Sequence, residues 1–304
     1  MKILYTSDIH VDRNHLDRLF AAGEHFKVHA VLIGGDLIPV GAWTLSASIE
    51  SQKKWLEDIF LPRLNIFHSK FPDTSFFFDF GNDDLMANRS LISDRGGRQL
   101  KLIHMQVLDI NPSLALVGYM IVPPTPFKLK DWEKLDSAKQ EGIDAYTIIK
   151  GAKTETGTER PHKLKLSDGT IEDDLRKLTE WLEKSPWQER PFLFISHAPP
   201  ADTKLDVLPD GRQVGSQAIR RFIEYWGKNG RLQASFHGHI HESPWMSGEV
   251  VDRIEGVPCF NAGQQAGQLR LLYFDSKNLE NSMKLVIVNG DRKPHKISTQ
   301  KVSM

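Results

Sequence analysis

The chain has 304 residues, of which 40% are hydrophobic and 26% are charged, as in an ordinary globular protein. Basic residues (Lys and Arg) number 39 and acidic residues (Asp and Glu) also number 39, so no overall charge directs the protein to nucleic acid or to an anionic membrane. The single cysteine, Cys259, excludes an internal disulfide and a cysteine-rich zinc site.

The first third of the chain alternates short apolar runs with longer stretches of helical spacing. The apolar runs predict β-strands at residues 2–7, 30–33 and 75–80. Helices are predicted at about 14–28, with Asn14 as the N-cap, and at about 46–69, where Pro62 could divide the helix in two. The strand–helix–strand order favours parallel pairing of the first two strands.

The remaining elements are predicted from shorter patterns. Strands are expected at 100–108 (one or two short ones), 115–122, 192–196 and 233–236. Helices are expected at 170–184 and 216–226, and Thr170 with Asp173 matches a capping box at the start of the first. Three later apolar runs predict antiparallel strands and a second sheet, at 257–260, 269–274 and 284–288.

No internal repeat and no linker is visible, so a single domain is predicted for residues 1–304. From about 123 to 166 the periodic pattern dissolves, and this insertion is predicted to be a mobile loop or lid near the site. The polar tail from about residue 291 is predicted to be frayed. No stretch is typical of a secretory signal, and no run approaches the roughly 18 apolar residues of a membrane helix. A cytoplasmic location without membrane association is therefore expected.

Side chains of the kind that bind metals follow the predicted strands, where the apolar runs end. Strand ends on one edge of an open sheet converge, so we expect these side chains to form one site. If the chain stays extended at the strand tips, residues two apart also point to the same side. The candidate ligands are Asp8, His10, Asp36, Asn82, His197, His239 and His241.

Seven protein ligands are too many for one ion and would suit two. The set contains oxygen and nitrogen donors but no thiolate, a composition that favours Mn, Fe or Zn. Paired metals about 3.5–4 Å apart serve phosphoryl chemistry, because they lower the pKa of a bridging water and clamp the oxygens of an in-line displacement. Asp36 sits alone on a tight turn after Gly34-Gly35 and is the expected bridging carboxylate.

Taken together, the motifs resemble those of the calcineurin-like metallophosphoesterases. The family pattern is Asp-x-His, Gly-Asp, Gly-Asn-His-Asp/Glu, a lone His and Gly-His-x-His. Over about residues 1–275 this chain carries it as Asp8-Ile9-His10, Gly35-Asp36, Gly81-Asn82-Asp83-Asp84, His197 and Gly238-His239-Ile240-His241.

The resemblance implies a fold, a ligand set and cofactors. The fold would be of the α/β (α+β) class, a four-layer sandwich of two mixed β-sheets flanked by helices. The cofactors would be two divalent or mixed-valence transition-metal ions, and Asn82 would also bind substrate. One ion would be held by Asp8, His10, Asp36 and His241. The other would be held by Asp36, Asn82, His197 and His239.

Position 83 departs from the family pattern. Family members usually carry a histidine there, which protonates the leaving group or contacts phosphate, whereas this chain has Asp83. An unperturbed aspartate titrates at about 3.9 and a histidine at about 6.5. Asp83, the candidate catalytic acid, would therefore need burial or the neighbouring Asp84 carboxylate to raise its pKa. Substrates with good leaving groups would need it least.

The leading hypothesis is a metal-dependent phosphoester hydrolase that uses a bridging hydroxide on a small-molecule substrate. A diester is favoured, because the motifs offer no Arg or Lys clamp for a monoester dianion. One alternative is a nuclease of the same family, although the neutral charge weighs against nucleic acid. The other is a metal-binding protein with weak or lost catalysis, because Asp83 replaces the usual histidine. The sequence leaves the oligomeric state open.

Overall fold

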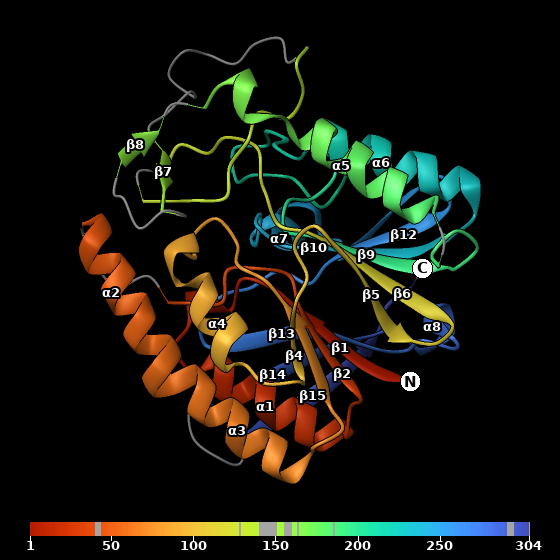
Figure 1. The fold of residues 1–304 in the computed structure, drawn as a ribbon. Coiled ribbons are helices and arrows are strands. Elements are labelled where there is room, and N and C mark those ends of the chain that lie inside the picture. Colours follow the sequence, from red (N-terminus) through yellow and green to blue (C-terminus); the bar gives the residue numbers. More distant parts are fainter. Residues whose placement is uncertain are drawn as a thin grey trace.

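Two mixed β-sheets pack face to face between two layers of helices in the computed structural model (Figure 1). The structure describes residues 1–39, 44–127, 129–139, 151–154, 160–162, 164–184, 186–290 and 295–303. The arrangement is the predicted four-layer α/β sandwich. No helix among the described residues is both long enough and apolar enough to cross a bilayer.

The first sheet has the strand order β15-β14-β13-β1-β2-β3-β4. Its parallel half comprises β1 (Lys2–Thr6), β2 (Ala30–Ile33), β3 (Ser75–Phe78) and β4 (Leu100–Leu102). Its antiparallel half comprises β13 (Gln268–Asp275), β14 (Lys284–Asn289) and β15 (Lys296–Lys301). The predicted parallel pairing of the first two strands is confirmed, with Tyr5 opposite Leu32.

The second sheet has the strand order β11-β12-β10-β9-β6-β5. Four parallel strands form its centre: β12 (Val257–Asn261), β10 (Leu232–His237), β9 (Phe192–Ser196) and β6 (Leu114–Tyr119). The edges are antiparallel: β11 (Val251–Ile254) and β5 (Gln106–Asn111). A separate pair forms within the insertion: β7 (Gly151–Lys153) and β8 (Arg160–His162).

Helices cover the outer face of each sheet (Figure 1). Those on the side of the first sheet are α1 (His15–Phe26), α2 (Leu45–Trp55), α3 (Leu61–Lys70) and α4 (Arg89–Arg95). The second sheet is covered by α5 (Ile171–Leu182) and α6 (Gln217–Asn229). Two short helices follow: α7 (Ser243–Ser247) and α8 (Leu279–Ser282). The capping box predicted for α5 is confirmed, because Thr170 Oγ1 accepts the Asp173 amide at 3.1 Å.

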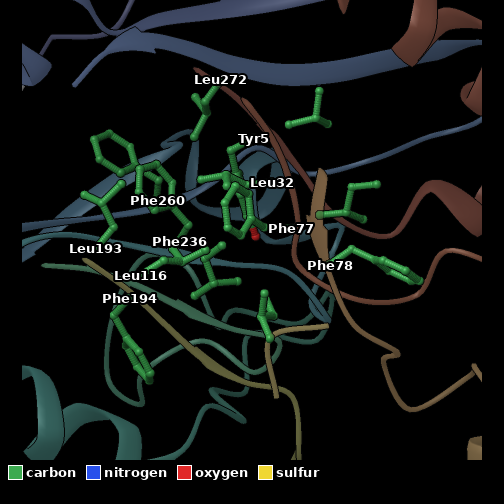
Figure 2. Close-up of a cluster of buried hydrophobic side chains, with 14 of the residues drawn as sticks. Tyr5, Leu32, Phe77, Phe78, Leu116, Leu193, Phe194, Phe236, Phe260 and Leu272 are labelled. Carbon is green, nitrogen blue, oxygen red and sulfur yellow. The ribbon is translucent and has the colours of Figure 1, made fainter. Parts of the chain in front are cut away.

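Aromatic and branched side chains fill the space between the two sheets (Figure 2). Phe236 from β10 lies with its ring centroid 5.0 Å from that of Tyr5 on β1 and 5.2 Å from that of Phe274 on β13. Both β1 and β10 are therefore buried in the centre of the molecule, and the loops that follow them are held on a rigid base.

Two helix predictions need correction. Asn14 precedes α1, but its side chain makes no capping bond; instead Asp12 accepts the Asn14 amide at 2.8 Å. Pro62 does not divide the helix, because a π-helical turn at Leu56–Phe60 joins α2 to α3. In that turn the Leu61 amide bonds to Leu56 O, which is five residues back. The wider turn places Pro62 in the first turn of α3, where its missing N–H costs little.

The C-terminal third also differs from its prediction. The strands from residue 257 onward do not form a separate second sheet: β12 joins β10 in parallel, whereas β13 joins β1 antiparallel in the first sheet. The predicted frayed tail from about 291 is wrong for Lys296–Lys301, which forms edge strand β15 paired with β14. The polar composition that suggested fraying reflects an edge strand whose side chains are mostly exposed.

The insertion at 123–166 is partly built into the fold. The Val122 amide bonds to Trp132 O at 2.9 Å, and the Asp131 amide bonds to Asn82 O at 2.8 Å. Trp132 is only 3% exposed, so this part of the insertion is packed rather than structureless. Residues 128, 140–150, 155–159 and 163 lie outside the described residues, and the role of the insertion as a lid stays a prediction.

A buried histidine gives the fold a pH dependence that can be tested. His15 is fully buried at the start of α1, and its Nε2 lies 3.2 Å from Gln268 O. Burial lowers its pKa to about 4. The unfolded chain, with a histidine pKa of about 6.5, therefore binds the proton first as the pH falls. This site's contribution to stability is complete above about pH 6.5 and is lost toward pH 4, at up to ~1.4 kcal/mol per pH unit.

We expect the variant His15→Gln to lose stability less steeply than the parent protein below pH 6.5. Glutamine can still donate to Gln268 O but does not titrate. Urea unfolding at pH 7.0, 6.0 and 5.0 measures the slopes. Equal slopes for the two proteins would mean that His15 is protonated in the folded state as readily as in the unfolded chain.

Candidate metal centre

The seven predicted ligands follow the ends of five central strands. Asp8 and His10 follow β1, whereas Asp36 and Asn82 follow β2 and β3 of the same sheet. From the second sheet, His197 follows β9, and His239 and His241 follow β10. Hydrogen bonds connect these loops: the Asp8 amide donates to Gly35 O at 3.0 Å, and the His239 amide donates to Asp8 Oδ1 at 3.0 Å. The Asp83 amide donates to Asp36 Oδ1 and the Gly238 amide donates to His197 O, each at 2.9 Å, so the structure brings all five loops together.

The prediction that the chain stays extended at the strand tips is wrong, although the donor atoms of Asp8 and His10 do lie close together. Asp8 has φ of 54° and precedes the 3₁₀ turn Ile9–Val11, so the strand does not continue to His10. Asp36 and His239 also have left-handed backbones, with φ of 51° and 65°. Such conformations are unfavourable for residues other than glycine, and they cluster at sites where function requires them.

Asp8, His10 and Asp36 form the first group of donors. One donor atom from each of these residues lies within 4.8 Å of those of the other two. Asp8 and Asp36 are buried, and His10 Nε2 lies 4.0 Å from Asp36 Oδ2. His241, predicted to complete this group, has its ring centroid 6.2 Å from that of His10 and lies at the more open side, 38% exposed.

Asp36 also contacts the second group of donors. His197 Nε2 lies 3.2 Å from Asp36 Oδ2 and 3.1 Å from Asn82 Oδ1. The other nitrogen, His197 Nδ1, lies 2.7 Å from Gly34 O, so it carries the hydrogen and leaves Nε2 as the donor to a metal. The ring of His239 is 5.2 Å from that of His197. Asp36 thus lies between the two groups, as its predicted bridging role requires.

The electrostatics of the protein alone show that this cluster attracts positive charge. Burial by itself would lower the pKa of His10, but the carboxylates of Asp36 and Asp83 raise it to about 10. Burial opposes protonation of His197 too, yet Asp36 raises its pKa to about 9. Burial, and then the cationic ring of His197, lower the pKa of His239 to about 3.

Two further observations fit bound cations. His10 Nε2 is buried without a hydrogen-bond partner, whereas the other nitrogen of the ring, Nδ1, lies 3.3 Å from Asp83 Oδ2. Glycines also leave room beside the carboxylates: a Cβ on Gly81 would overlap Asp36 Oδ1, and one on Gly238 would lie 2.5 Å from Asp8 Oδ2. The oxygen and nitrogen donors present therefore fit Mn, Fe or Zn, as predicted. Which metals bind, and how many, stays a prediction.

Asp83, the predicted acid, lies inside this cluster. Its amide donates to Asp36 Oδ1 at 2.9 Å, and its Oδ1 accepts from Asn82 Nδ2 at 3.0 Å. Burial and the Asp36 carboxylate raise the pKa of Asp83, whereas the contact with His10 lowers it. The direction of the shift is the one that a catalytic acid needs. The same contact, however, lets Asp83 orient His10.

Asp84 is a residue whose role the sequence did not reveal. Its buried carboxylate accepts the amides of Leu37 at 2.9 Å, Ile38 at 2.8 Å and Gly81 at 3.0 Å. It thereby joins the loop of Asp36 to the loop of Asn82. Burial and Asp36 raise the pKa of Asp84 to about 7. One signal for this role is present in the sequence: the family motif ends in an acidic residue at this position.

A cavity of about 560 Å³ opens onto the cluster. It is lined by five of the predicted ligands, while Asp8 and His197 lie buried against Asp36 and the neighbouring donors. This volume is in the usual range for small-molecule sites. Asp83, Ile240 and Glu242 also line the cavity, and the other lining residues come from the start of the insertion, which was expected near the site, and from the 208–214 turn, which was not predicted. The ligands that line the cavity are His10, Asp36, Asn82, His239 and His241.

Solved structures share this fold. The chain is similar to a protein from Thermus thermophilus, with a TM-score of 0.53 and 14% identity, over 99% of this chain and 98% of that chain. It is also similar to a dimetal phosphatase from Danio rerio, with a TM-score of 0.52 and 12% identity, over 100% of this chain and 99% of that chain. At such identities the likeness concerns the fold alone.

No curated protein sequence matches the chain significantly. A family description does match: the calcineurin-like phosphoesterases, over residues 1–243. The match covers most of the chain and includes every candidate ligand from Asp8 to His241. The protein therefore belongs to the calcineurin-like phosphoesterase family.

Proposed function

We propose that this protein hydrolyses phosphodiesters with a dinuclear metal centre. The family supports metal-dependent phosphoester hydrolysis in general. The observation that carries the finer proposal is the position of Asp36, whose one carboxylate contacts both groups of donors, with His10 on one side and His197 on the other. Two groups of donors that share one carboxylate suit two ions better than one.

Bound divalent cations would supply the activated water and would offset the negative charge that develops on the phosphoryl oxygens. The chain's own residues fix the geometry around them. Asn82 faces the second donor group through Oδ1 and keeps Nδ2 as a donor beside the cavity, which suits the predicted contact with a phosphoryl oxygen. Asp83 accepts from His10 Nδ1, which holds the ring with Nε2 toward the donor cluster.

The charges around the cavity favour a diester over a monoester. Among the described residues that line it, Arg212 is the one lysine or arginine, and Arg212 Nε is paired with Asp210 Oδ2 at 2.7 Å. Carboxylates from Asp36, Asp83 and Glu242 line the same cavity. A monoester dianion would meet more negative charge here with less compensation than a diester, which carries one negative charge at pH 7.

The proposal is tested on protein reconstituted in turn with Mn²⁺, Fe²⁺ and Zn²⁺. We expect turnover of bis(4-nitrophenyl) phosphate to exceed that of 4-nitrophenyl phosphate, to require metal and to stop on chelation. Metal analysis should find two ions per chain. Turnover that survives exhaustive chelation would contradict metal catalysis, and full activity with one ion per chain would contradict a dinuclear centre.

The variant Asp83→His tests whether a stronger acid was lost at this position. We expect it to raise the turnover of diesters with poor leaving groups by roughly 10²-fold, the lower end of general-acid effects, and to change 4-nitrophenyl esters little. Metal content, measured on the same samples, shows whether His10 remains oriented. A variant that holds two ions but gains nothing on poor leaving groups would contradict an acid role. Bound metal without turnover in either protein would instead indicate a non-catalytic metal-binding protein.

A further inference from the structure

The cavity beside the candidate metal centre has one strongly apolar side. Its residues come from the start of the insertion, which we call the proline segment (residues 123–127), and from the 208–214 turn. Phe127 is 53% exposed, although it is among the largest apolar side chains of the protein. An exposed aromatic ring beside a polar cluster is typical of a ligand site. The apolar lining residues are Pro123, Pro124, Pro126, Phe127, Leu208 and Val214.

The proline segment is held in place by a buried ion pair. Lys130 is fully buried, and its Nζ lies 2.7 Å from Glu133 Oε2. Glu133 Oε1 accepts both the amide of Thr125 at 2.9 Å and its hydroxyl at 2.6 Å, and Lys130 Nζ donates to Thr125 O. Burying two charges is costly unless every polar atom finds a partner. The arrangement therefore fixes Thr125, at the centre of the proline segment, in one position.

The 208–214 turn on the other side is equally fixed. Asp206 is fully buried and accepts the amides of Thr203 and Gly215, each at 3.0 Å. The Val214 amide donates to Asp206 O at 3.1 Å, and the Leu208 amide donates to Arg212 O at 2.8 Å. The apolar side of the cavity is thus preformed, so binding there costs little conformational entropy.

From these observations we infer that one ester group of the substrate is apolar, and that it binds between the proline segment and the 208–214 turn while the phosphate meets the metals. This inference rests on the proposed function and narrows its substrate class to phosphodiesters with an alkyl or aryl group of several carbons. A sugar or a second phosphate at this position would meet proline rings and Phe127, with Arg212 already paired to Asp210.

Two matched comparisons test the inference. In the first, methyl and butyl 4-nitrophenyl phosphate share a leaving group and differ by three methylenes. We expect kcat/KM for the butyl ester to be higher by on the order of tenfold, since each fully buried methylene can contribute up to about fourfold. In the second, calorimetry on the Mn²⁺-loaded protein should show that dibutyl phosphate binds at least tenfold more tightly than dimethyl phosphate, with no turnover required.

Two variants test whether the apolar side of the cavity causes the preference for the butyl ester. Phe127→Ala should reduce the butyl-to-methyl ratio in both comparisons severalfold. Ile66→Ala removes another exposed apolar side chain, 60% exposed on α3, which contributes none of the described residues that line the cavity. It should leave both ratios unchanged. A butyl-to-methyl ratio near one in the parent protein, or equal effects of the two variants on this ratio, overturns the inference. Neither result contradicts the proposed phosphodiester hydrolysis. Absence of both metal uptake and turnover overturns the proposed function and the inference with it.

Discussion

Replacing Asp36 with asparagine is expected to reduce diester turnover by at least about 10³-fold, which corresponds to about 4 kcal/mol of transition-state stabilisation. One carboxylate oxygen, Asp36 Oδ2, lies 4.0 Å from His10 Nε2 and 3.2 Å from His197 Nε2, so the change removes negative charge from both donor groups at once. We therefore expect metal analysis to show fewer than two ions per chain, because bound cations lose the ligand that the two groups share.

Asparagine is the substitution of choice because it keeps a hydrogen bond that holds the loop: the amide oxygen can still accept from the Asp83 amide, which now donates to Asp36 Oδ1 at 2.9 Å. The metal-free variant loses the attraction of Asp36 for His10 and His197, so we expect a lower melting temperature than for the parent. Metal content and turnover are therefore compared well below the melting temperature of the variant, on folded protein. Asp73→Asn, at an exposed position before β3, is the matched control and should retain metal and turnover. Two ions per chain and normal turnover in Asp36→Asn would contradict a shared ligand.

The positions of the ligands could be predicted because each follows an apolar run that became a central strand. Asp8, Asp36 and Asn82 follow the adjacent parallel strands β1, β2 and β3, and parallel strand tips at one edge lie close together. A strand can be predicted from the hydrophobic pattern of its own few residues, so this part of the site is visible in the sequence. The two sheets could be expected from the family resemblance, since nothing local shows that β10 will lie across from β1.

The details that depend on contacts between distant residues could not be predicted. Asp8 has a left-handed backbone where its amide donates to Gly35 O and its carboxylate accepts the His239 amide, so it contacts two other loops. A local rule about extended strands therefore gave the right neighbours for the wrong reason. The insertion is a second example. Its lack of a periodic pattern predicted a mobile loop, yet Lys130 and Glu133 are buried partners that support the proline segment.

The same reasoning explains the wrong prediction for the C-terminus. A polar segment such as Lys296–Lys301 buries little apolar surface, which is the usual signature of a frayed end. It is ordered as a strand because the exposed edge of β14 offers backbone hydrogen bonds, and a sequence pattern does not show whether a free edge exists. The register of β15 is likewise set by its partner strand, β14.

The largest effect on the fold of the site is expected from Asp84→Ala. The change removes the acceptor of three buried amides, from Leu37, Ile38 and Gly81. Each unsatisfied buried amide costs about 1–3 kcal/mol, so we expect roughly 3–5 kcal/mol of destabilisation after partial relaxation. For a protein of this size that lowers the melting temperature by on the order of 10 °C, measured by thermal unfolding of the metal-free protein.

The variant should also bind metal more weakly, by about 10–100-fold, as for other residues that support metal ligands. Asp84 joins the loops of Asp36 and Asn82, and without it only the bond from the Asp83 amide to Asp36 Oδ1, among those described above, holds these loops together, so the two donor groups can separate even where the chain still folds. Asp73→Ala is the control, since it removes the same charge from an exposed site at the far end of β3. If Asp84→Ala and Asp73→Ala melt alike and bind Mn²⁺ alike, the three hydrogen bonds to Asp84 do not hold the metal centre together.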